Sequence, residues 1–384
     1  MIVSIGRLLR RLAAVLALLL LAAPFALHFA VLPWFDQRLN AVAGIAPKPV
    51  PVAVREFHDA AFVADMHADS LLWGRDLSEH NERGQADLPR LRQGGVDLQV
   101  FSAVTRVPRG MNYASNSADS DSLPILFIAA WRPPATWFRP RERALVQARE
   151  LRRLTAGRQL TLVTRRGDLA ATGLRGLLAL EGMHALEGDA AALETLYGAG
   201  YRMMGLAHFF DNEIAGSAHG VERYGLTPLG RRLLPRMEAL GITVDLAHAS
   251  PAAFADTLEI ATRPVVVSHG GVAGTCPGPR NLEDSQLRAI AANGGVIGIG
   301  FWKGAVCEPG ITGITAAMLH AVRVAGIDHV GLGSDFDGAI SAPFDASGLP
   351  QLTAALLDAG LSRADVEKVL GGNLRRVLEA NLPP

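Results

Sequence analysis

The chain has 384 residues, of which 49% are hydrophobic, and it carries 37 basic and 37 acidic residues. This hydrophobic content is enough for a sizeable core and excludes a wholly disordered chain. The balanced charge gives no overall field that would attract an anionic polymer, so we expect no nucleic-acid partner. With only two cysteines, the chain has neither a cysteine-rich zinc site nor a disulfide scaffold.

Residues 1–39 are expected to form a signal-anchor or a signal peptide. Arg7, Arg10 and Arg11 precede an apolar stretch over residues 12–34, which is long enough to cross a bilayer as a helix. The basic residues on its leading side predict a membrane anchor with the domain that follows it outside the cytoplasm, which is the periplasm in a Gram-negative bacterium. The alternative is a cleaved signal peptide, with the domain secreted to the same compartment.

Residues 40–55 are expected to be a linker, since three prolines fall between positions 40 and 52. From there on, residues 56–384 alternate short apolar runs with longer stretches of helical character. Continuous apolar runs are typical of parallel strands that are covered on both faces. Eight such runs occur, over residues 62–66, 96–104, 176–180, 201–206, 242–246, 264–267, 296–301 and 329–333.

Helical segments are expected between and after these runs, among them residues 228–240, 251–261, 283–292, 314–325 and 363–370. Strand and helix thus alternate eight times along the chain. This alternation predicts an α/β fold of the closed (β/α)8 TIM-barrel type, preceded by the N-terminal segment.

Residues 108–140 do not fit the strand–helix repeat. They are rich in prolines and aromatic residues, among them Trp131, Trp137 and Phe138. The segment follows the second strand, on the face where barrel enzymes build their active sites, so it could serve as a lid or as the contact of a homodimer. A packed surface excursion is the alternative.

Cys276 and Cys307 both follow late strands of the predicted barrel, on the same face. They could form one disulfide in an oxidising compartment or remain two independent thiols.

Side chains that can bind metal follow the predicted strands at their carboxyl ends. His67 and Asp69 end the first strand, and their spacing of two places both on the same side of an extended chain. The other candidates follow later strands and are Glu181, His208, His248, His269 and Asp335. Four of the eleven histidines therefore fall at strand ends, whereas His80, His184 and His320 are expected on helix surfaces.

Imidazole and carboxylate groups suit Zn²⁺ and related divalent ions, and a site without cysteine ligands is typical of catalysis. The candidate ligands outnumber what one ion needs. A carboxylate between them, Glu181, could bridge two ions about 3.5–4 Å apart. We therefore expect two Zn²⁺ or other divalent ions per chain, which would acidify a shared water and stabilise a tetrahedral oxyanion.

In order and spacing, these residues resemble the membrane (renal-type) dipeptidases, peptidase family M19 of the amidohydrolase superfamily. The resemblance covers nearly all of the chain after the linker. It rests on the motifs His67-Ala68-Asp69, Leu180-Glu181-Gly182, Leu206-Ala207-His208, Val244-Asp245-Leu246-Ala247-His248, Val267-Ser268-His269, Arg280-Asn281 and Gly333-Ser334-Asp335-Phe336-Asp337-Gly338.

The resemblance implies a binuclear zinc site with Glu181 as the bridging ligand. The remaining ligands that it implies are His67, Asp69 and Asp335 for one ion, and His248 and His269 for the other. It further implies that His208 polarises the scissile carbonyl and that Asp335 passes a proton from the bridging hydroxide to the leaving amine. It also implies that Arg280 pairs with the substrate carboxylate, a role that suits the bidentate guanidinium.

The chain departs from the family pattern after the seventh strand. Gly300-Phe301-Trp302 stands where the family commonly has Asn-Phe-Tyr, so Trp302 is expected at the substrate without the usual hydroxyl. We expect hydrolysis of L,L and L,D dipeptides. The alternative is the same metal site acting on another small amide, an N-acyl amino acid or a lactone. A non-catalytic binding barrel is disfavoured because no metal ligand is missing.

Overall fold

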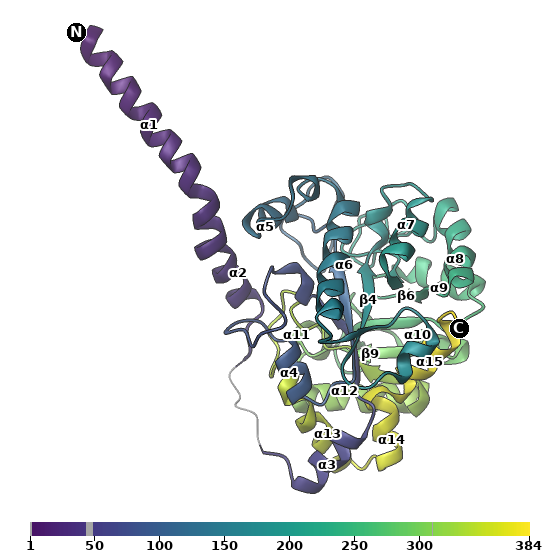
Figure 1. Ribbon diagram of the computed structural model, residues 1–384. Helices are drawn as coiled ribbons and strands as arrows, with labels where there is room; N and C mark the ends of the chain where they lie inside the picture. Colours follow the sequence, from purple (N-terminus) through teal and green to yellow (C-terminus); the bar gives the residue numbers. More distant parts are fainter. Residues whose placement is uncertain (1, 44–48, 309) are drawn as a thin grey trace.

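The computed structural model describes residues 2–43, 49–308 and 310–384. A long N-terminal helix projects from a domain in which helices surround strands, and the C-terminus lies on that domain (Figure 1). Residues 44–48 of the predicted linker lie outside the described residues.

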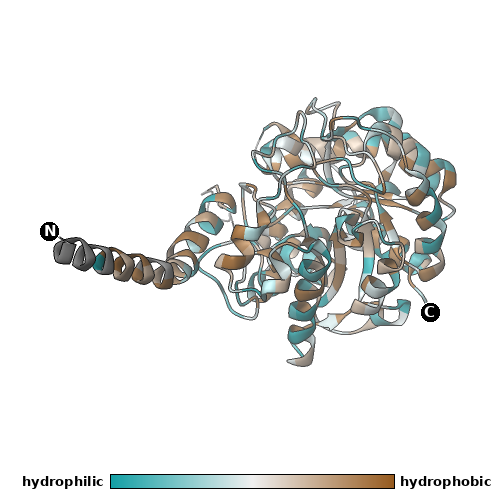
Figure 2. Cartoon of the chain, turned by 90° about the horizontal axis from the view of Figure 1, so that it is seen from above, coloured by the Kyte–Doolittle hydropathy of each residue, from teal (hydrophilic) through white to brown (hydrophobic). Residues whose placement is uncertain are grey.

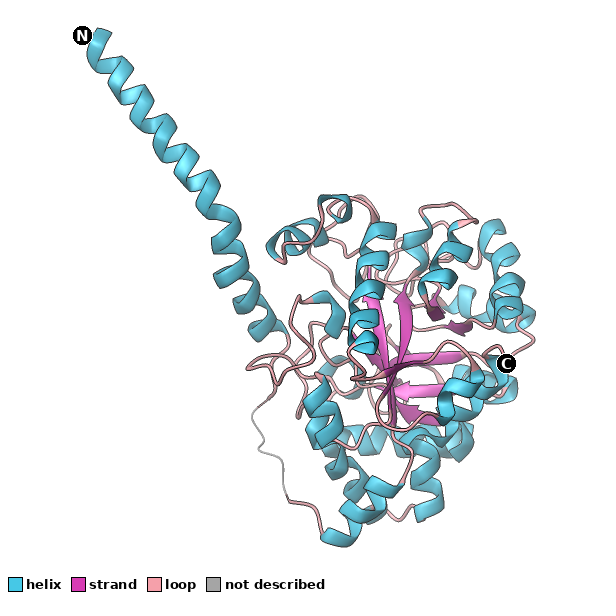
Figure 3. Cartoon of the chain, viewed as in Figure 1, coloured by secondary structure: helices cyan, strands magenta, loops and turns pink. Residues whose placement is uncertain are grey.

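The centre of the domain is a closed barrel of parallel strands (Figure 3). Of the ten strands among the described residues, β3 pairs only with β4 and β8 only with β7, which leaves eight in the ring. The ring closes because β2 pairs with both β1 and β4. In ring order, the strands are β1 (Ala64–Ala68), β2 (Leu98–Val104), β4 (Arg175–Glu181), β5 (Tyr201–Gly205), β6 (Thr243–Asp245), β7 (Val266–Val272), β9 (Val296–Ile299) and β10 (Val330–Leu332).

Each of the eight predicted apolar runs overlaps one strand of the ring, so the predicted barrel is confirmed. Every residue of these strands is buried, because side chains face either the barrel interior or the surrounding helices. The two outer strands, β3 (Thr161–Leu162) and β8 (Asn281–Leu282), are too short to show a sequence pattern.

Helices cover the outside of the barrel (Figure 3). The α-helices are α3 (Val52–Ala60), α4 (Leu88–Gln93), α5 (Leu123–Ala129), α6 (Pro140–Ala156), α7 (Ala192–Ala199), α8 (Pro228–Leu240), α9 (Pro251–Ile260), α10 (Asp284–Asn293), α11 (Lys303–Val306), α12 (Ile311–Ala325), α13 (Leu349–Asp358), α14 (Arg363–Glu367) and α15 (Asn373–Asn381). Helix α8 matches its prediction because local signals fix both ends. The hydroxyl of Thr227 caps its first turn, and Gly241 ends it with a φ of 74°.

The helix predicted over residues 363–370 is only partly correct. Helix α14 ends at Glu367, and a π-helical segment, Lys368–Gly372, follows it. The helical path is interrupted at Gly371, whose φ of 179° is not helical, and a Cβ at this position would lie 2.4 Å from the carbonyl oxygen of Phe62.

The N-terminal rod consists of α1 (Ile2–Ala26), a π-helical turn η1 (Leu27–Val31) and α2 (Leu32–Leu39). Residues 11–39 are apolar and long enough to cross a membrane by length and composition (Figure 2). The lower end of this rod is docked on the barrel. Asp36 is fully buried and lies 3.2 Å from Nε of Arg75 and 2.9 Å from Nε of Arg83.

The chain continues to contact the barrel after this rod. Val42 forms a β-bridge with Ala342, and helix α3 begins at Val52, inside the predicted linker. The described parts of residues 40–55 are therefore structured, although the boundaries of the predicted linker stay a prediction.

The segment 108–140 lies beside the rod (Figure 1). It contains α5, which contacts α1 and η1. The indole of Trp131 stacks on the imidazole of His28 with ring centroids 3.8 Å apart. Part of the segment therefore packs against the chain's own helix, while Phe138 remains exposed. A role as a lid stays a prediction. The homodimer stays a prediction.

Candidate metal centre

The seven predicted metal-site and catalytic residues meet at the carboxyl ends of the barrel strands. Six of the strands of the ring position them directly or through the residues that follow. The positions are His67 and Asp69 at β1, Glu181 at β4, His208 after β5, His248 after β6, His269 on β7 and Asp335 after β10. All seven side chains are buried, as the parallel ring requires at its centre.

One oxygen atom of Glu181 lies at the centre of this cluster. Its Oε1 is 3.0 Å from Nε2 of His248 and 3.4 Å from Nε2 of His269. The Nε2 atoms of His208 and His67 lie 3.5 and 3.6 Å from the same oxygen. A single carboxylate therefore faces four imidazoles from different strands.

A second group of carboxylates surrounds His67. Its Nε2 lies 3.3 Å from Oδ1 of Asp69 and 3.8 Å from Oδ1 of Asp335. The seven residues of the cluster can be grouped into three overlapping triads. Within each triad, the possible ligand atoms lie within 4.8 Å of one another. The triads are His67, His269 and Asp335; Glu181, His208 and His248; and His67, Asp69 and Glu181.

The cluster has the unsatisfied polar atoms that a metal site requires. Nε2 of His67, Oδ1 of Asp69, Oε2 of Glu181 and Nδ1 of His248 are buried without a hydrogen-bond partner among the described residues. Buried polar atoms rarely lack a partner, so four such atoms in one cluster indicate that another group, such as an ion, binds there. Imidazoles and carboxylates without cysteine are the donors of catalytic divalent-metal sites. The residues present therefore fit a metal ion.

The electrostatics of the cluster agree with this fit. Burial, together with the nearby carboxylate of Asp69, raises the pKa of Glu181 well above its usual value. Burial likewise raises the pKa of Asp335 to about 8 and lowers the pKa of His248 and of His269. A divalent cation would favour the ionised carboxylates and the neutral imidazoles, which are the forms that bind metal.

Two ligand candidates are held in an unusual backbone conformation. His248 and Asp335 have φ values of 62° and 61°, in the left-handed region that residues other than glycine seldom occupy. Such conformations persist only where the surroundings hold them, and they are concentrated at functional sites.

Buried carboxylates beneath the cluster hold the adjoining backbone. Asp65 accepts hydrogen bonds from the backbone N–H of Ser334 at 2.8 Å and from its hydroxyl at 2.7 Å. Asp245 accepts hydrogen bonds from the N–H groups of Ala247 and Ser268, both at 2.9 Å. The sequence analysis did not identify Asp65 as a supporting residue. Its position in the sequence could have indicated this role, because an acidic side chain inside an apolar strand is buried and needs a hydrogen-bond partner.

Arg280 lies beside the imidazoles, directly before β8. Its guanidinium Nη2 donates a hydrogen bond of 2.9 Å to the carbonyl oxygen of His269 and lies 3.4 Å from Nε2 of His248. The guanidinium carbon is 5.7 Å from the ring centroid of Trp302. The structure thus brings Arg280 and Trp302, which were predicted to bind substrate, to the metal-ligand cluster.

Two residues near the site were not singled out from the sequence. Tyr113, in the segment 108–140, accepts a hydrogen bond of 2.9 Å at its hydroxyl from Nε1 of Trp302. His219 is fully buried, and its Nδ1 lies 3.0 Å from the carbonyl oxygen of Tyr113. Both residues lie on loops without periodic structure, so no pattern predicted their position.

The expectation that His184 lies on a helix surface is wrong. His184 is buried in the short turn Met183–Leu186 and stacks on Phe210 with ring centroids 4.4 Å apart. The turn follows β4 directly, so it packs into the barrel mouth instead of facing solvent.

The cluster lines a cavity of about 600 Å³, which also takes in Arg280 and Trp302. This volume lies within the range of small-molecule sites. A neighbouring cavity of about 690 Å³ contains His184 but none of the candidate ligands, so the chemistry belongs to the first cavity.

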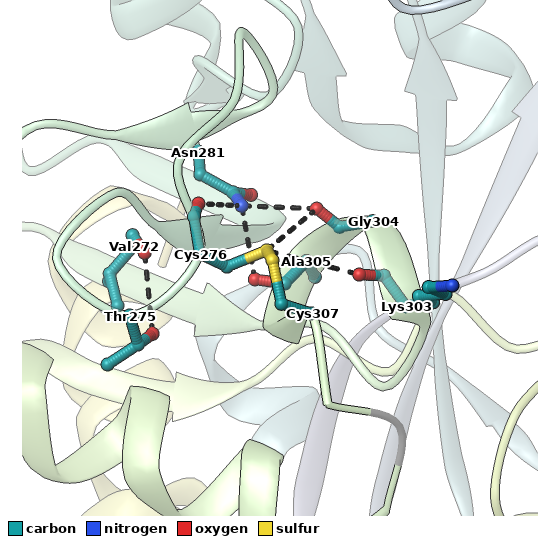
Figure 4. Close-up of a disulfide and its surroundings, with 8 residues drawn as sticks. All are labelled: Val272, Thr275, Cys276, Asn281, Lys303, Gly304, Ala305 and Cys307. Carbon is teal, nitrogen blue, oxygen red and sulfur yellow. Dashed lines mark hydrogen bonds between the residues drawn. A yellow bond between two sulfur atoms is a disulfide. The ribbon is translucent and has the colours of Figure 1, made fainter.

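Cys276 and Cys307 form a disulfide with Cα atoms 5.3 Å apart, which is the first of the two alternatives (Figure 4). The bond joins the loop after β7 to the residue after α11. The side-chain amide of Asn281 donates to the carbonyl oxygens of Cys276 at 2.7 Å and Gly304 at 3.1 Å. These contacts hold the segments that carry Arg280 and Trp302 together.

Comparison with known sequences assigns the chain to a family. Residues 53–382 match the family profile described as membrane dipeptidase, peptidase family M19. Dipeptidase tcpJ of Claviceps purpurea is 30% identical over 306 residues, which cover 77% of this chain and 69% of that protein.

Solved structures agree with this assignment. A metallo peptidase of Rhodobacter sphaeroides, liganded with a phosphinate mimic of the dipeptide L-Ala-D-Ala, has a TM-score of 0.68 and 26% identity, covering 84% of this chain and 99% of that one. The probable dipeptidase PvdM of Pseudomonas aeruginosa has a TM-score of 0.74 over 86% of this chain and 98% of its own; at 19% identity, it supports the fold alone. The chain belongs to the membrane dipeptidase family, peptidase family M19, and is a metal-dependent peptide-bond hydrolase of that family.

Proposed function

We propose that this chain hydrolyses the peptide bond of dipeptides with two divalent metal ions, zinc in the first instance. The observation that carries the proposal is the position of Glu181, whose Oε1 lies within 3.0 to 3.6 Å of four imidazole nitrogens. A buried carboxylate with four imidazole nitrogens around it suits a bridge between two cations.

The proposed ligands divide into two sets that share Glu181. His67, Asp69 and Asp335 would hold one ion, and His248 and His269 would hold the other. The ions would supply Lewis-acid chemistry, which activates water and polarises the scissile carbonyl. No cysteine competes for them, since both cysteines are in the disulfide.

The protein side chains would orient the substrate and move the proton. Arg280 would bind the C-terminal carboxylate, which limits the substrate to one residue beyond the scissile bond. His208 faces the cluster from β5, and its Nε2 would hold the scissile carbonyl oxygen. Asp335 would carry the proton released by the attacking water to the leaving amine. Trp302 would form the wall next to Arg280.

A D-residue at the C-terminal position is included in this proposal. The Rhodobacter sphaeroides relative binds a mimic of L-Ala-D-Ala, and it covers most of this chain. The apolar rod and the disulfide support a membrane-anchored domain in an oxidising compartment outside the cytoplasm.

The test is an assay of L,L and L,D dipeptides with the full chain in phospholipid nanodiscs. We expect chelation to abolish cleavage, zinc to restore it, and Glu181→Gln to lower kcat by at least 1,000-fold, on the order of 4 kcal/mol in the barrier. Glu194→Gln, at an exposed helix position, is the matched control and should keep full activity. Cleavage that survives chelation, or a fully active Glu181→Gln variant, would exclude the proposed centre.

A further inference from the structure

The cavity at the metal-ligand cluster extends into a region lined by apolar side chains, which we call the apolar arm. Its wall includes Leu32, Phe35, Leu72, Val104, Val107 and Leu126. Most of these residues belong to a hydrophobic cluster that is separate from the barrel core. The arm is part of the same cavity of about 600 Å³ that contains the metal-ligand cluster.

The arm lies across the barrel mouth from Arg280. Leu72 follows β1, and Val104 is the last residue of β2. The guanidinium of Arg280 donates a hydrogen bond to His269 on β7. Strand β7 is four strands from β2 in either direction around the ring of eight. A substrate with its carboxylate at Arg280 and its scissile carbonyl at the cluster would therefore direct its acyl side into the arm.

The chemistry of the arm suits a hydrocarbon chain better than an amino acid. Among the described residues that line the cavity, the acidic ones are Asp69, Glu181 and Asp335, and all three belong to the metal-ligand cluster. The ammonium group of a dipeptide would find no separate anionic partner in the arm. An acyl chain needs none, and each of its methylene groups gains from leaving water.

The N-terminal rod supplies one wall of the arm and connects it to the candidate membrane-spanning segment. Val31, Leu32, Phe35 and Leu39 line the cavity and end the apolar segment Arg11–Leu39 (Figures 1 and 2). Ile125 of α5 also lines the cavity and is 60% exposed, on the helix that contacts η1. An apolar surface thus leads from the membrane helix to the cluster.

We propose that this chain also hydrolyses long-chain N-acyl amino acids taken from the bilayer, with the acyl chain in the apolar arm and the amino-acid carboxylate at Arg280. This inference rests on the proposed function, because the same metal centre would cleave the bond. Water adds to the amide, whose C–N bond breaks. The carbonyl carbon keeps the hydroxyl as a fatty acid, and the nitrogen takes the proton as the free amino acid.

The experiment uses the full, zinc-loaded chain in phospholipid nanodiscs. The substrates are N-acetyl-, N-octanoyl- and N-lauroyl-L-alanine, with L-Ala-L-Ala as the dipeptide. We expect kcat/KM to rise at least tenfold from the acetyl to the lauroyl compound. The transfer of one methylene group out of water can raise kcat/KM by at most about fourfold, which sets the upper limit for each added group.

Substitutions in α5 separate binding in the arm from simple partitioning into lipid. Leu126→Trp narrows the arm and should lower kcat/KM for the lauroyl compound at least tenfold, while cleavage of L-Ala-L-Ala changes less than twofold. Ile125→Asp, at an exposed lining position, is a second variant with the same expectation. Ile128→Trp is the matched control, since Ile128 is on the same helix but does not line the cavity.

A binding measurement gives a readout that does not depend on turnover. Equilibrium dialysis of radiolabelled N-lauroyl-L-alanine with the metal-free chain should show binding that Leu126→Trp weakens and Ile128→Trp does not. Cleavage of L-Ala-L-Ala with no cleavage of any acyl compound would overturn this inference and leave the dipeptidase proposal intact. Cleavage of the lauroyl compound alone would support the inference and overturn the dipeptide as substrate. Cleavage of neither, with two ions bound per chain, would overturn both.

Discussion

At the scale of single residues, the candidate site was largely predictable from the sequence. Metal-binding side chains at the ends of apolar runs are conspicuous because a buried polar group needs a reason to be there. His67, Glu181 and His269 could be found in this way. Tyr113 and His219 could not, because they reach the site through loops whose path depends on tertiary packing.

Arg280 allows a direct test of carboxylate binding. We expect Arg280→Lys to lower kcat/KM for dipeptides by about 10- to 100-fold, because a lysine lacks the planar fork that grips a carboxylate at two points. The same variant should change kcat/KM for the C-terminal amides of these dipeptides by less than threefold. The measurement is the ratio of the two values of kcat/KM. An equal loss on both substrates would mean that Arg280 supports the site without binding the carboxylate.

The hydrogen bond between Tyr113 and Trp302 is a second prediction at this scale. We expect Tyr113→Phe to lower the free energy of unfolding by about 1 kcal/mol, because the indole N–H of Trp302 loses its acceptor in a mostly buried place. A double-mutant cycle with Trp302→Phe measures the coupling. The prediction requires the two substitutions together to lower stability by less than the sum of the single effects.

At the scale of elements, sequence patterns predicted what is long and regular. The eight apolar runs became strands because both faces of the barrel wall are buried, and α8 kept its predicted ends through Thr227 and Gly241. Sequence patterns did not predict the short or irregular segments, whose structure depends on tertiary packing. The two residues of β8 have no period of their own, and the apolar pattern does not indicate the non-helical backbone of Gly371 within Lys368–Gly372.

The disulfide joins two elements whose sequence separation is 31 residues. We expect the Cys276→Ser/Cys307→Ser variant to lose about 3–4 kcal/mol of unfolding free energy, because the open loop gains conformational entropy when unfolded. Denaturant titration of the two proteins measures this difference. A reducing agent should lower the stability of the unaltered chain and have no effect on the variant. A variant as stable as the original under oxidising conditions would contradict the prediction.

At the scale of the whole molecule, the N-terminal rod is part of the folded domain. Asp36 binds Arg75, and Nη2 of Arg75 lies 2.7 Å from Oδ2 of Asp337. Asp337 follows Asp335 by two positions. A chain of buried charges thus connects the rod to the loop that carries a candidate metal ligand, which the sequence could not reveal because the partners lie far apart along the chain.

This connection predicts that soluble fragments differ in stability according to where they begin. A fragment of residues 27–384 keeps α2, whereas one of residues 50–384 removes Asp36 and leaves Arg75 with one partner fewer. We expect the longer fragment to be more stable by about 3 kcal/mol, the cost of breaking a buried ion pair. Calorimetry or denaturant titration measures the difference. Asp36→Ala in the longer fragment is the control and should reproduce most of the loss.

In the proposed membrane-anchored enzyme, the docked rod would also determine how the reaction velocity depends on substrate concentration. A flexible tether would let the barrel sample the bulk solution, and the reaction velocity would then follow molar concentration. Because α2 is held against the barrel by Asp36, a rod anchored in a bilayer would keep the cavity mouth at a fixed height above the lipid. For any amphiphilic substrate, the velocity would then follow its mole fraction in the surface, and adding inert phospholipid would slow the reaction by surface dilution alone.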